Sequence, residues 1–160
     1  MDAQTFSQEA MKHERLLYRI SWAYLRRDED CADAVQETLL KAWQQRHRLR
    51  SMEAFRAWLC RILVNTCKDM LKRRSRTDTL ELTENITAAP AGQEALELRE
   101  AIDHLPPEQR MCVILHYLEG WSVAEVAQAL GVPQGTVKTR LMYARGRMKG
   151  YLEEEKEAGA

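Results

Sequence analysis

The sequence of 160 residues repeats apolar side chains at the three- and four-residue spacing of a helix face, and it does so along most of its length. The clearest such run consists of Phe55, Trp58, Leu59, Ile62, Leu63, Thr66 and Met70. Strand-like alternation is absent, and four Pro and seven Gly are few for this length. The spacing therefore predicts an all-α fold. The expected helices lie near residues 5–26, 30–46, 52–74, 93–104, 107–118, 122–130 and 134–154.

Residues 75–92 interrupt this pattern. They are rich in Thr, Ala and acidic residues, and they include Pro90 and Gly92. This composition is typical of a linker. The sequence thus predicts two small helical domains, residues 1–76 and 98–155, joined by an acidic flexible linker over residues 77–97.

Several classes of protein are excluded by composition. No apolar run approaches the length of about 20 residues that a membrane-spanning helix needs, so we expect no direct membrane insertion. The first residues show no secretory signal, and we expect a cytoplasmic protein. Four cysteines form no Cys-x-x-Cys pair, and no His lies at finger spacing from a Cys pair, so we expect no metal site. We also expect no cofactor. A redox role for Cys60 and Cys67 is an alternative, but the two residues lie about 10 Å apart along a helix, too far for a disulfide without distortion.

The charges are segregated along the chain although 24 basic and 24 acidic residues cancel. Residues 41–76 carry 11 basic and 2 acidic side chains, and residues 138–149 carry five basic side chains and no acid. An acidic segment lies between these stretches. Two separated basic stretches suit a polyanion that contacts both halves of the chain, and they favour nucleic acid over two merely solvated helix faces.

The C-terminal half has the pattern of a helix-turn-helix. Ser122 and Glu125 form a capping box that starts one helix, Gly131 turns the chain, and Val137 and Leu141 anchor the next helix inside. The free face of that second helix would enter a DNA major groove. The alternative is a three-helix bundle that binds no DNA.

The segment 53–76 of the N-terminal half mixes aromatic and basic residues, which is the chemistry of single-stranded nucleic-acid binding. We expect Trp43 and Phe55 to be core residues instead, because they occupy helical core positions. Asn65 interrupts an apolar run. Two roles are open for it: satisfying backbone groups in the interior, or hydrogen-bonding the edge of an extruded base.

Three parts of the sequence resemble one known family. Residues 30–43 (DCADAVQETLLKAW) resemble the core-binding helix of the extracytoplasmic-function (ECF) sigma factors of bacterial RNA polymerase, and residues 55–66 (FRAWLCRILVNT) resemble their −10-reading segment. Leu105–Arg110, Glu119–Ala127 and Gly135–Arg140 resemble their −35-reading helix-turn-helix domain. The resemblance implies a sigma2-like and a sigma4-like domain in one chain of the sigma-70 family.

The resemblance also implies residue roles. The residues that would dock on the polymerase core are Asp33, Gln36, Glu37 and Lys41. The residues that would hold −10 DNA, with loop 46–52 forming a pocket for a flipped base, are Arg46, Arg48, Arg61, Asn65, Lys68, Lys72 and Arg73. The residues that would contact −35 DNA are Thr136, Lys138, Thr139, Arg140, Met142, Tyr143 and Arg145. Further implied features are an anti-sigma factor as partner and a stress or envelope-response regulon.

Two other function classes are alternatives to a sigma factor. An autonomous helix-turn-helix regulator of duplex DNA would need a dimerisation or sensor element, and residues 1–74 contain no heptad run. An enzyme such as a metal-dependent nuclease would need convergent carboxylates. Asp28, Glu29, Asp30 and Asp33 do cluster, but at a helix start, where acidic residues are ordinary. We therefore expect a protein that is not an enzyme.

Overall fold

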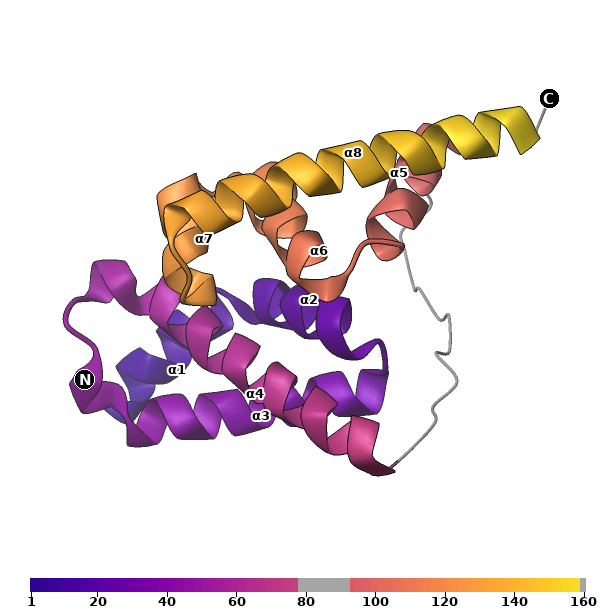
Figure 1. The fold of residues 1–160 in the computed structure, drawn as a ribbon. Helices are drawn as coiled ribbons and strands as arrows, with labels where there is room; N and C mark the ends of the chain where they lie inside the picture. The colour runs from indigo at the N-terminus through magenta and orange to yellow at the C-terminus, as the bar shows by residue number, and fades with distance from the viewer. Residues whose placement is uncertain (78–92, 159–160) are drawn as a thin grey trace. The chain divides into compact units, whose positions relative to one another are not determined.

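The computed structural model describes residues 1–77 and 93–158, and the regular secondary structure of these residues is helical, with no strand among them (Figure 1). The helices before the gap are α1 Ala3–Met11, α2 Glu14–Leu25, α3 Asp28–Gln44 and α4 Phe55–Thr77. The helices after the gap are α5 Gln93–Asp103, α6 Pro107–Val113, α7 Val123–Leu130 and α8 Gln134–Ala158. The predicted all-α fold is confirmed.

The chain divides into two compact units. The first holds Met1–Asn85 with Gln128–Gly131, and the second holds Ile86–Ala127 with Val132–Ala160. Most of the predicted linker over 77–97 lies outside the described residues. Its ends do not, because Thr77 ends α4 and α5 begins at Gln93.

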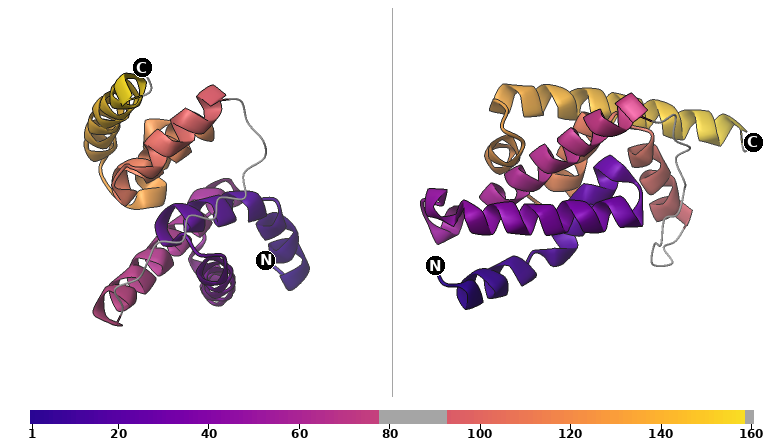
Figure 2. Two further views of the ribbon diagram at one scale, coloured as in Figure 1. Left: turned by 90° about the vertical axis from the view of Figure 1, so that its right-hand side faces the viewer. Right: turned by 90° about the horizontal axis from the view of Figure 1, so that it is seen from below.

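The core of the first unit is made by α2, α3 and α4, which pack against one another, with α4 running obliquely across α3 (Figure 2). Large side chains at its centre are fully buried: Leu17, Ile20, Leu25, Phe55, Leu59 and Leu63. Helix α1 joins this core through Phe6, whose ring meets the edges of Trp43 and Phe55 at centroid distances of 5.5 and 5.8 Å. Phe55 is therefore a core residue as predicted, and Trp43 is half-buried.

The prediction of a single helix over 5–26 is wrong. Helix α1 ends at Met11, and α2 starts at Glu14 after a break at Lys12 and His13. The break allows the half-buried His13 ring to lie over Phe55, at 6.1 Å between centroids. No Gly or Pro marks this position, so packing against α4 overrides the local helical pattern.

The second unit is organised by α8, which packs along α5 and α6 (Figure 1). Helix α6 starts with Pro107 at its first position and passes into a π-helical turn, η3 Ile114–Leu118. The core of the second unit consists of buried apolar residues from several helices: Met111, Leu115, Trp121, Val126, Val137 and Leu141. Helix α8 continues to Ala158, four residues beyond the predicted end.

Candidate nucleic-acid interface

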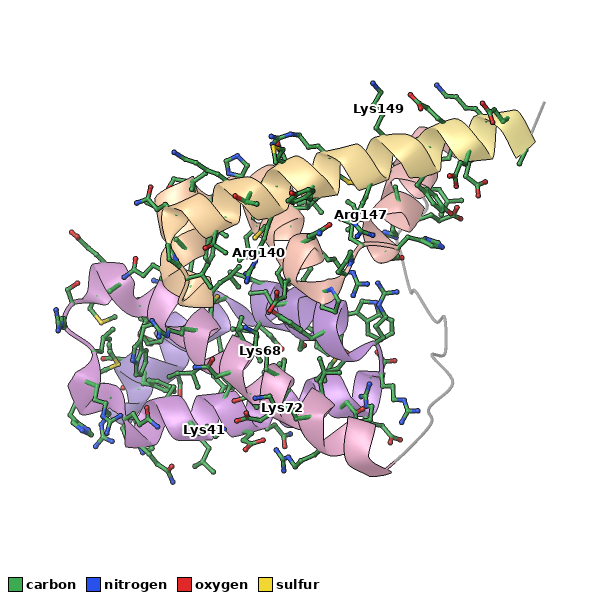
Figure 3. All side chains as sticks on the ribbon, viewed as in Figure 1. Lys41, Lys68, Lys72, Arg140, Arg147 and Lys149 are labelled. Carbon is green, nitrogen blue, oxygen red and sulfur yellow. The ribbon has the colours of Figure 1, made fainter. Side chains whose placement is uncertain are left out.

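One face of α4 carries four polar residues at the spacing i, i+4, i+7 and i+11. This α4 stripe consists of Arg61, Asn65, Lys68 and Lys72. Residues at this spacing share one side of a helix, and the two lysines are labelled on α4 in Figure 3. Arg61, Asn65 and Lys72 are exposed, and Lys68 is half-buried. The α4 stripe therefore presents three cations and one amide side by side.

The exposure of the Asn65 side chain distinguishes between the two roles that the sequence left open. Its side chain is exposed, while the neighbouring Val64 and Thr66 are buried. The interior role is wrong, because an exposed amide satisfies no buried backbone group. Both its donor and its acceptor can serve a bound molecule. Arg73, one residue beyond the α4 stripe, is exposed as well.

The loop between α3 and α4 begins with the short 3₁₀ turn η1 Arg46–Arg48, and a second turn, η2 Met52–Ala54, leads into α4. Arg46 lies 3.8 Å over the Trp43 ring, and its Nη1 donates to the Trp43 carbonyl at 2.7 Å. The Arg46 guanidinium therefore caps the C-terminal end of α3. Arg48, in contrast, is exposed. The structure thus separates two arginines that the sequence placed together.

The polar face of α3 holds the residues predicted to dock on the polymerase core. Asp33 and Gln36 are exposed and Glu37 is half-buried. Sequence reasoning missed Leu40, whose side chain is 57% exposed on the same face, seven residues after Asp33. The signal was present, because Leu40 lies off the buried positions Cys31, Ala34, Thr38 and Ala42.

Lys41 differs from the other residues of this group because it turns toward α4 (Figure 3). Its Nζ lies 3.2 Å from Glu37 Oε1 and donates to Thr66 Oγ1 at 3.2 Å. The Thr66 hydroxyl in turn donates to the Ile62 carbonyl at 2.9 Å. Lys41 therefore links α3 to the helix that bears the α4 stripe.

The helix-turn-helix has the local features that the sequence predicted. Ser122 Oγ accepts from Glu125 N at 3.1 Å, and Glu125 Oε1 accepts from Ser122 N at 3.4 Å, which completes the capping box of α7. Gly120 and Gly131 have φ of +75° and +70°, the left-handed region that favours glycine. Val137 and Leu141 are buried and hold α8 in place.

The outer face of α8 displays most of the residues predicted to contact −35 DNA. Lys138, Thr139 and Arg145 are exposed, and Met142 and Tyr143 are 53% and 58% exposed. The Thr139 hydroxyl donates to the Gly135 carbonyl at 3.0 Å. Thr136, at the start of the helix, is half-buried. A face of this kind can present both hydrogen-bonding and apolar groups to base edges.

Arg140 is not brought to this outer face. Its Nη2 lies 3.3 Å from Glu108 Oε2 of α6, and its side chain is only 19% exposed. In Figure 3 it lies on the side of α8 opposite Lys149. Burial raises the pKa of the neighbouring Cys112 thiol, and the Arg140 guanidinium acts in the opposite direction. Arg140 therefore packs α8 against α6.

Two further arginines, Arg74 and Arg110, hold helix ends. Arg74 pairs with Asp30 and donates to the Leu25 carbonyl at 3.0 Å, which ties α4 to the corner between α2 and α3. Arg110 is 7% exposed and donates to the carbonyls of Asp103 and Leu105 at 2.8 and 2.7 Å. Their sequence context did not distinguish either from a surface cation.

The four cysteines are buried thiols. Burial raises the pKa of Cys31 and raises that of Cys67 to about 12, so both resist forming the reactive thiolate. Within the described residues, no cluster of His, Cys, Asp and Glu could hold a metal ion. No helix of that part of the chain is long and apolar enough to span a membrane.

These observations define a class: an all-helical protein with a cationic helix, α4, in its N-terminal half and a helix-turn-helix, α7 and α8, in its C-terminal half. Comparison with known families agrees. Residues 10–77 match the sigma-70 region 2 family, and residues 95–148 match the sigma-70 region 4 family. Both matches fall in the order that the sequence resemblance implied.

Known relatives cover nearly the whole chain. The ECF RNA polymerase sigma factor SigM of Mycobacterium tuberculosis is 36% identical over 157 residues, which is 94% of this chain and 80% of SigM. The RNA polymerase sigma factor SigV of Bacillus subtilis is 31% identical over 147 residues, 89% of this chain and 88% of SigV. The sigma factor RpoE of Bartonella quintana, solved with the anti-sigma factor NepR, has a TM-score of 0.78 at 26% identity, covering 94% of this chain and 98% of RpoE. The chain therefore belongs to the sigma-70 family and is an RNA polymerase sigma factor of the ECF type.

Proposed function

We propose that this sigma factor docks on the polymerase core through α3, holds the non-template −10 strand along α4 and reads the −35 duplex with α8. It acts in the cytoplasm as a non-catalytic initiation factor. The observation that carries the proposal is the exposed Asn65 amide within the cationic α4 stripe. The proposed domain bounds are 1–76 and 98–155, with a linker over 77–97 whose last five residues belong to α5.

The −10 role rests on the chemistry of α4. A strand separated from its complement offers phosphates along one edge and unpaired base edges along the other. Arg61 and Lys68 supply charge two helical turns apart, and Lys72 follows one turn later. Asn65, between Arg61 and Lys68, supplies one donor and one acceptor group. Arg48 would extend the cationic surface from the preceding loop. Arg46 contributes by fixing that loop on Trp43.

The docking role rests on the exposed face of α3. Asp33, Gln36 and Glu37 form a polar surface one to two helical turns before the exposed Leu40. Interfaces commonly combine a central apolar contact with a polar rim. Lys41 then acts differently from the other three residues: through Thr66 it holds α4 against the docking helix.

The −35 role rests on the outer face of α8. Lys138, Thr139, Met142 and Tyr143 are exposed near the N-terminal half of the helix, the part that enters the groove in helix-turn-helix proteins. Thr136 lies at the helix start, where backbone N–H groups attract phosphate. Arg140, paired with Glu108, contributes by fixing α8.

An anti-sigma factor is the proposed regulatory partner. RpoE of Bartonella quintana was solved in complex with the anti-sigma factor NepR, and its fold matches this chain over both units. A partner of this kind would cover surfaces that otherwise bind polymerase and DNA. We keep a stress or envelope-response regulon as the expected target. Membership of the sigma family does not favour the alternative of an autonomous regulator.

Footprinting with sigma-free core polymerase tests the proposal. The purified chain is added to core, and a promoter library is probed for strand opening with and without core. We expect core-dependent opening near −10. Asn65→Ala should abolish opening while binding to core is retained, and Lys138→Ala with Thr139→Ala should abolish −35 selection.

Lys12→Ala is the matched control for these variants. Lys12 is an exposed lysine directly after α1, and its Nζ lies 2.7 Å from Glu9 Oε1, so its replacement should leave opening and selection unchanged. Tight binding to duplex DNA in the absence of core, with no strand opening, would reject the proposal and favour an autonomous regulator.

A further inference from the structure

We propose that Tyr117 and Arg145 together form a binding site for a phosphate of the DNA backbone beside the −35 element. Tyr117 belongs to none of the residue sets implied by sequence, and it comes from the π-helical turn η3 instead of α8. The inference rests on the proposed −35 role of α8. It extends that interface to a second element of the helix-turn-helix unit.

The site is defined by a hydrogen bond between exposed side chains of two elements. Arg145 Nη1 donates to the Tyr117 hydroxyl oxygen at 2.7 Å. Both residues are exposed, Tyr117 to 49%. A hydrogen bond between two exposed side chains contributes little to folding, because water competes for both groups. It does restrict where the guanidinium of Arg145 points.

The Tyr117 ring is itself held in place. It packs edge-on against the His116 ring at 4.9 Å between centroids, and His116 Nδ1 lies 2.7 Å from the Trp121 carbonyl oxygen. The π-helical turn is closed by the bond from Glu119 N to the Ile114 carbonyl at 2.9 Å. Trp121 is almost fully buried. The phenol is thereby anchored to the unit's core, so the arginine that it orients is pre-positioned as well.

The position of Arg145 along α8 suits the DNA backbone. Lys138, Met142, Arg145 and Lys149 follow at i, i+4, i+7 and i+11, so they share one side of the helix, and Lys149 projects outward in Figure 3. Arg145 lies about 10 Å beyond Lys138 along the axis. A major groove is about 12 Å wide. When the start of α8 reads bases, a residue two turns later therefore reaches the level of a flanking phosphate.

The two side chains offer the right chemistry for such a phosphate. A guanidinium has five N–H donors, and the hydroxyl that accepts one of them still has its own proton to donate. The pair thus aims several donors and one positive charge at the same point. Arg140 has a different arrangement, because the Glu108 carboxylate already lies 3.3 Å from its guanidinium. In the described part of the chain, Arg145 has no ion pair of that kind.

Promoter affinity of the holoenzyme tests this site. Binding to a promoter fragment is measured across a range of salt concentrations for wild type, Tyr117→Phe, Arg145→Gln and the double variant. Loss of the hydroxyl should weaken binding roughly three- to tenfold. Arg145→Gln should weaken it further and reduce the slope of log affinity against log salt by about one. In the double variant, Tyr117→Phe should have a smaller effect than in wild type, because the hydroxyl no longer orients Arg145.

Tyr18→Phe is the matched control, because it also removes a tyrosine hydroxyl that makes a 2.7 Å hydrogen bond, here to Asp28 in the other unit. Wild-type affinity and salt slope for Tyr117→Phe, with −35 selection still lost in Lys138→Ala/Thr139→Ala, would overturn the phosphate site alone. Equal, additive losses from Tyr117→Phe in the presence and absence of Arg145 would also overturn it. Failure of wild-type holoenzyme to select promoters would overturn the proposed function and this site together.

Discussion

At the scale of single residues, arginines that look alike in the sequence have different environments. Arg61 and Arg145 are exposed on helix faces, whereas Arg110 is buried against backbone carbonyls. Arg74 and Arg140 each pair with a carboxylate of another helix. Sequence can indicate that a segment is basic, but the partner carboxylates and carbonyls come from other elements. The assignment of individual cations to DNA or to packing therefore needs the structure.

The dependence of stability on alkaline pH tests whether burial keeps the Cys67 thiol neutral. Cys67 has its pKa raised from 9.0 to about 12 by burial, so the folded state favours the neutral thiol. Its contribution to stability is complete below the unfolded pKa and is lost as pH rises from about 9 to about 12. We expect the urea midpoint of wild type to fall over this range, and we expect the fall to be smaller in Cys67→Ala.

Chemical labelling gives an independent check on the same thiols. All four cysteines are buried, so iodoacetamide near pH 8 should modify none of them in the native chain and all of them after denaturation. Mass spectrometry distinguishes these results. Rapid native labelling at Cys67, with an unchanged midpoint at high pH, would show that this thiol is accessible.

At the scale of helices, local signals predicted most of the fold because each signal is contained in a few neighbouring residues. The capping box at Ser122, Pro107 at a helix start and Gly131 at the turn are of this kind. The break at His13 is different. Its cause is packing against Phe55, more than 40 residues away in sequence, and nothing near residue 13 records it.

In the candidate site, too, the sequence predicts local features but not contacts between distant helices. Periodicity alone puts Asn65 and the α4 cations on one side of a helix, but only the structure exposes Asn65 and turns Lys41 toward Thr66. Tyr117 was missed because its partner Arg145 is 28 residues away. Such contacts depend on how helices pack, which the helical pattern of each segment does not specify.

Substitution of two glycines, Gly120 and Gly150, tests where the second unit needs a left-handed backbone. A Cβ at Gly150, within α8, or at Gly120, after η3, would meet no atom within 4 Å, so space does not distinguish them. Gly120 has φ +75°, whereas Gly150 is helical. We expect Gly150→Ala to stabilise by about 0.5–1 kcal/mol, because alanine favours the helix. Gly120→Ala should destabilise by about 1–2 kcal/mol through left-handed strain.

Amide hydrogen exchange of α6 and α8 measures both changes within the second unit. Slower exchange in Gly150→Ala and faster exchange in Gly120→Ala are the expected results. The same sign for both variants would contradict the argument, because steric space is equal at the two positions. Neither glycine belongs to the proposed DNA or polymerase surfaces, so promoter selection should be retained.

At the scale of the whole molecule, basic charge is divided between two proposed DNA-binding surfaces on one chain. The basic stretches 41–76 and 138–149 carry the proposed −10 and −35 contacts. Two linked sites bind one promoter more tightly than either site alone, because the first contact raises the effective concentration of the second. Each surface can then be weak by itself. We therefore expect specificity to require both promoter elements and the polymerase core.

Salt dependence distinguishes the contributions of the two surfaces. Single-stranded DNA releases about 0.7 counterion for each phosphate contact, against about 0.9 for duplex. Lys68→Gln with Lys72→Gln should therefore lower the slope of log affinity against log salt for holoenzyme on an opened promoter by about 1.4. The variant should leave the slope for a −35 duplex probe unchanged, as Lys12→Gln should for both probes. An equal reduction on both probes would mean that the α4 lysines act through general charge, and the division of labour between the two units would then be wrong.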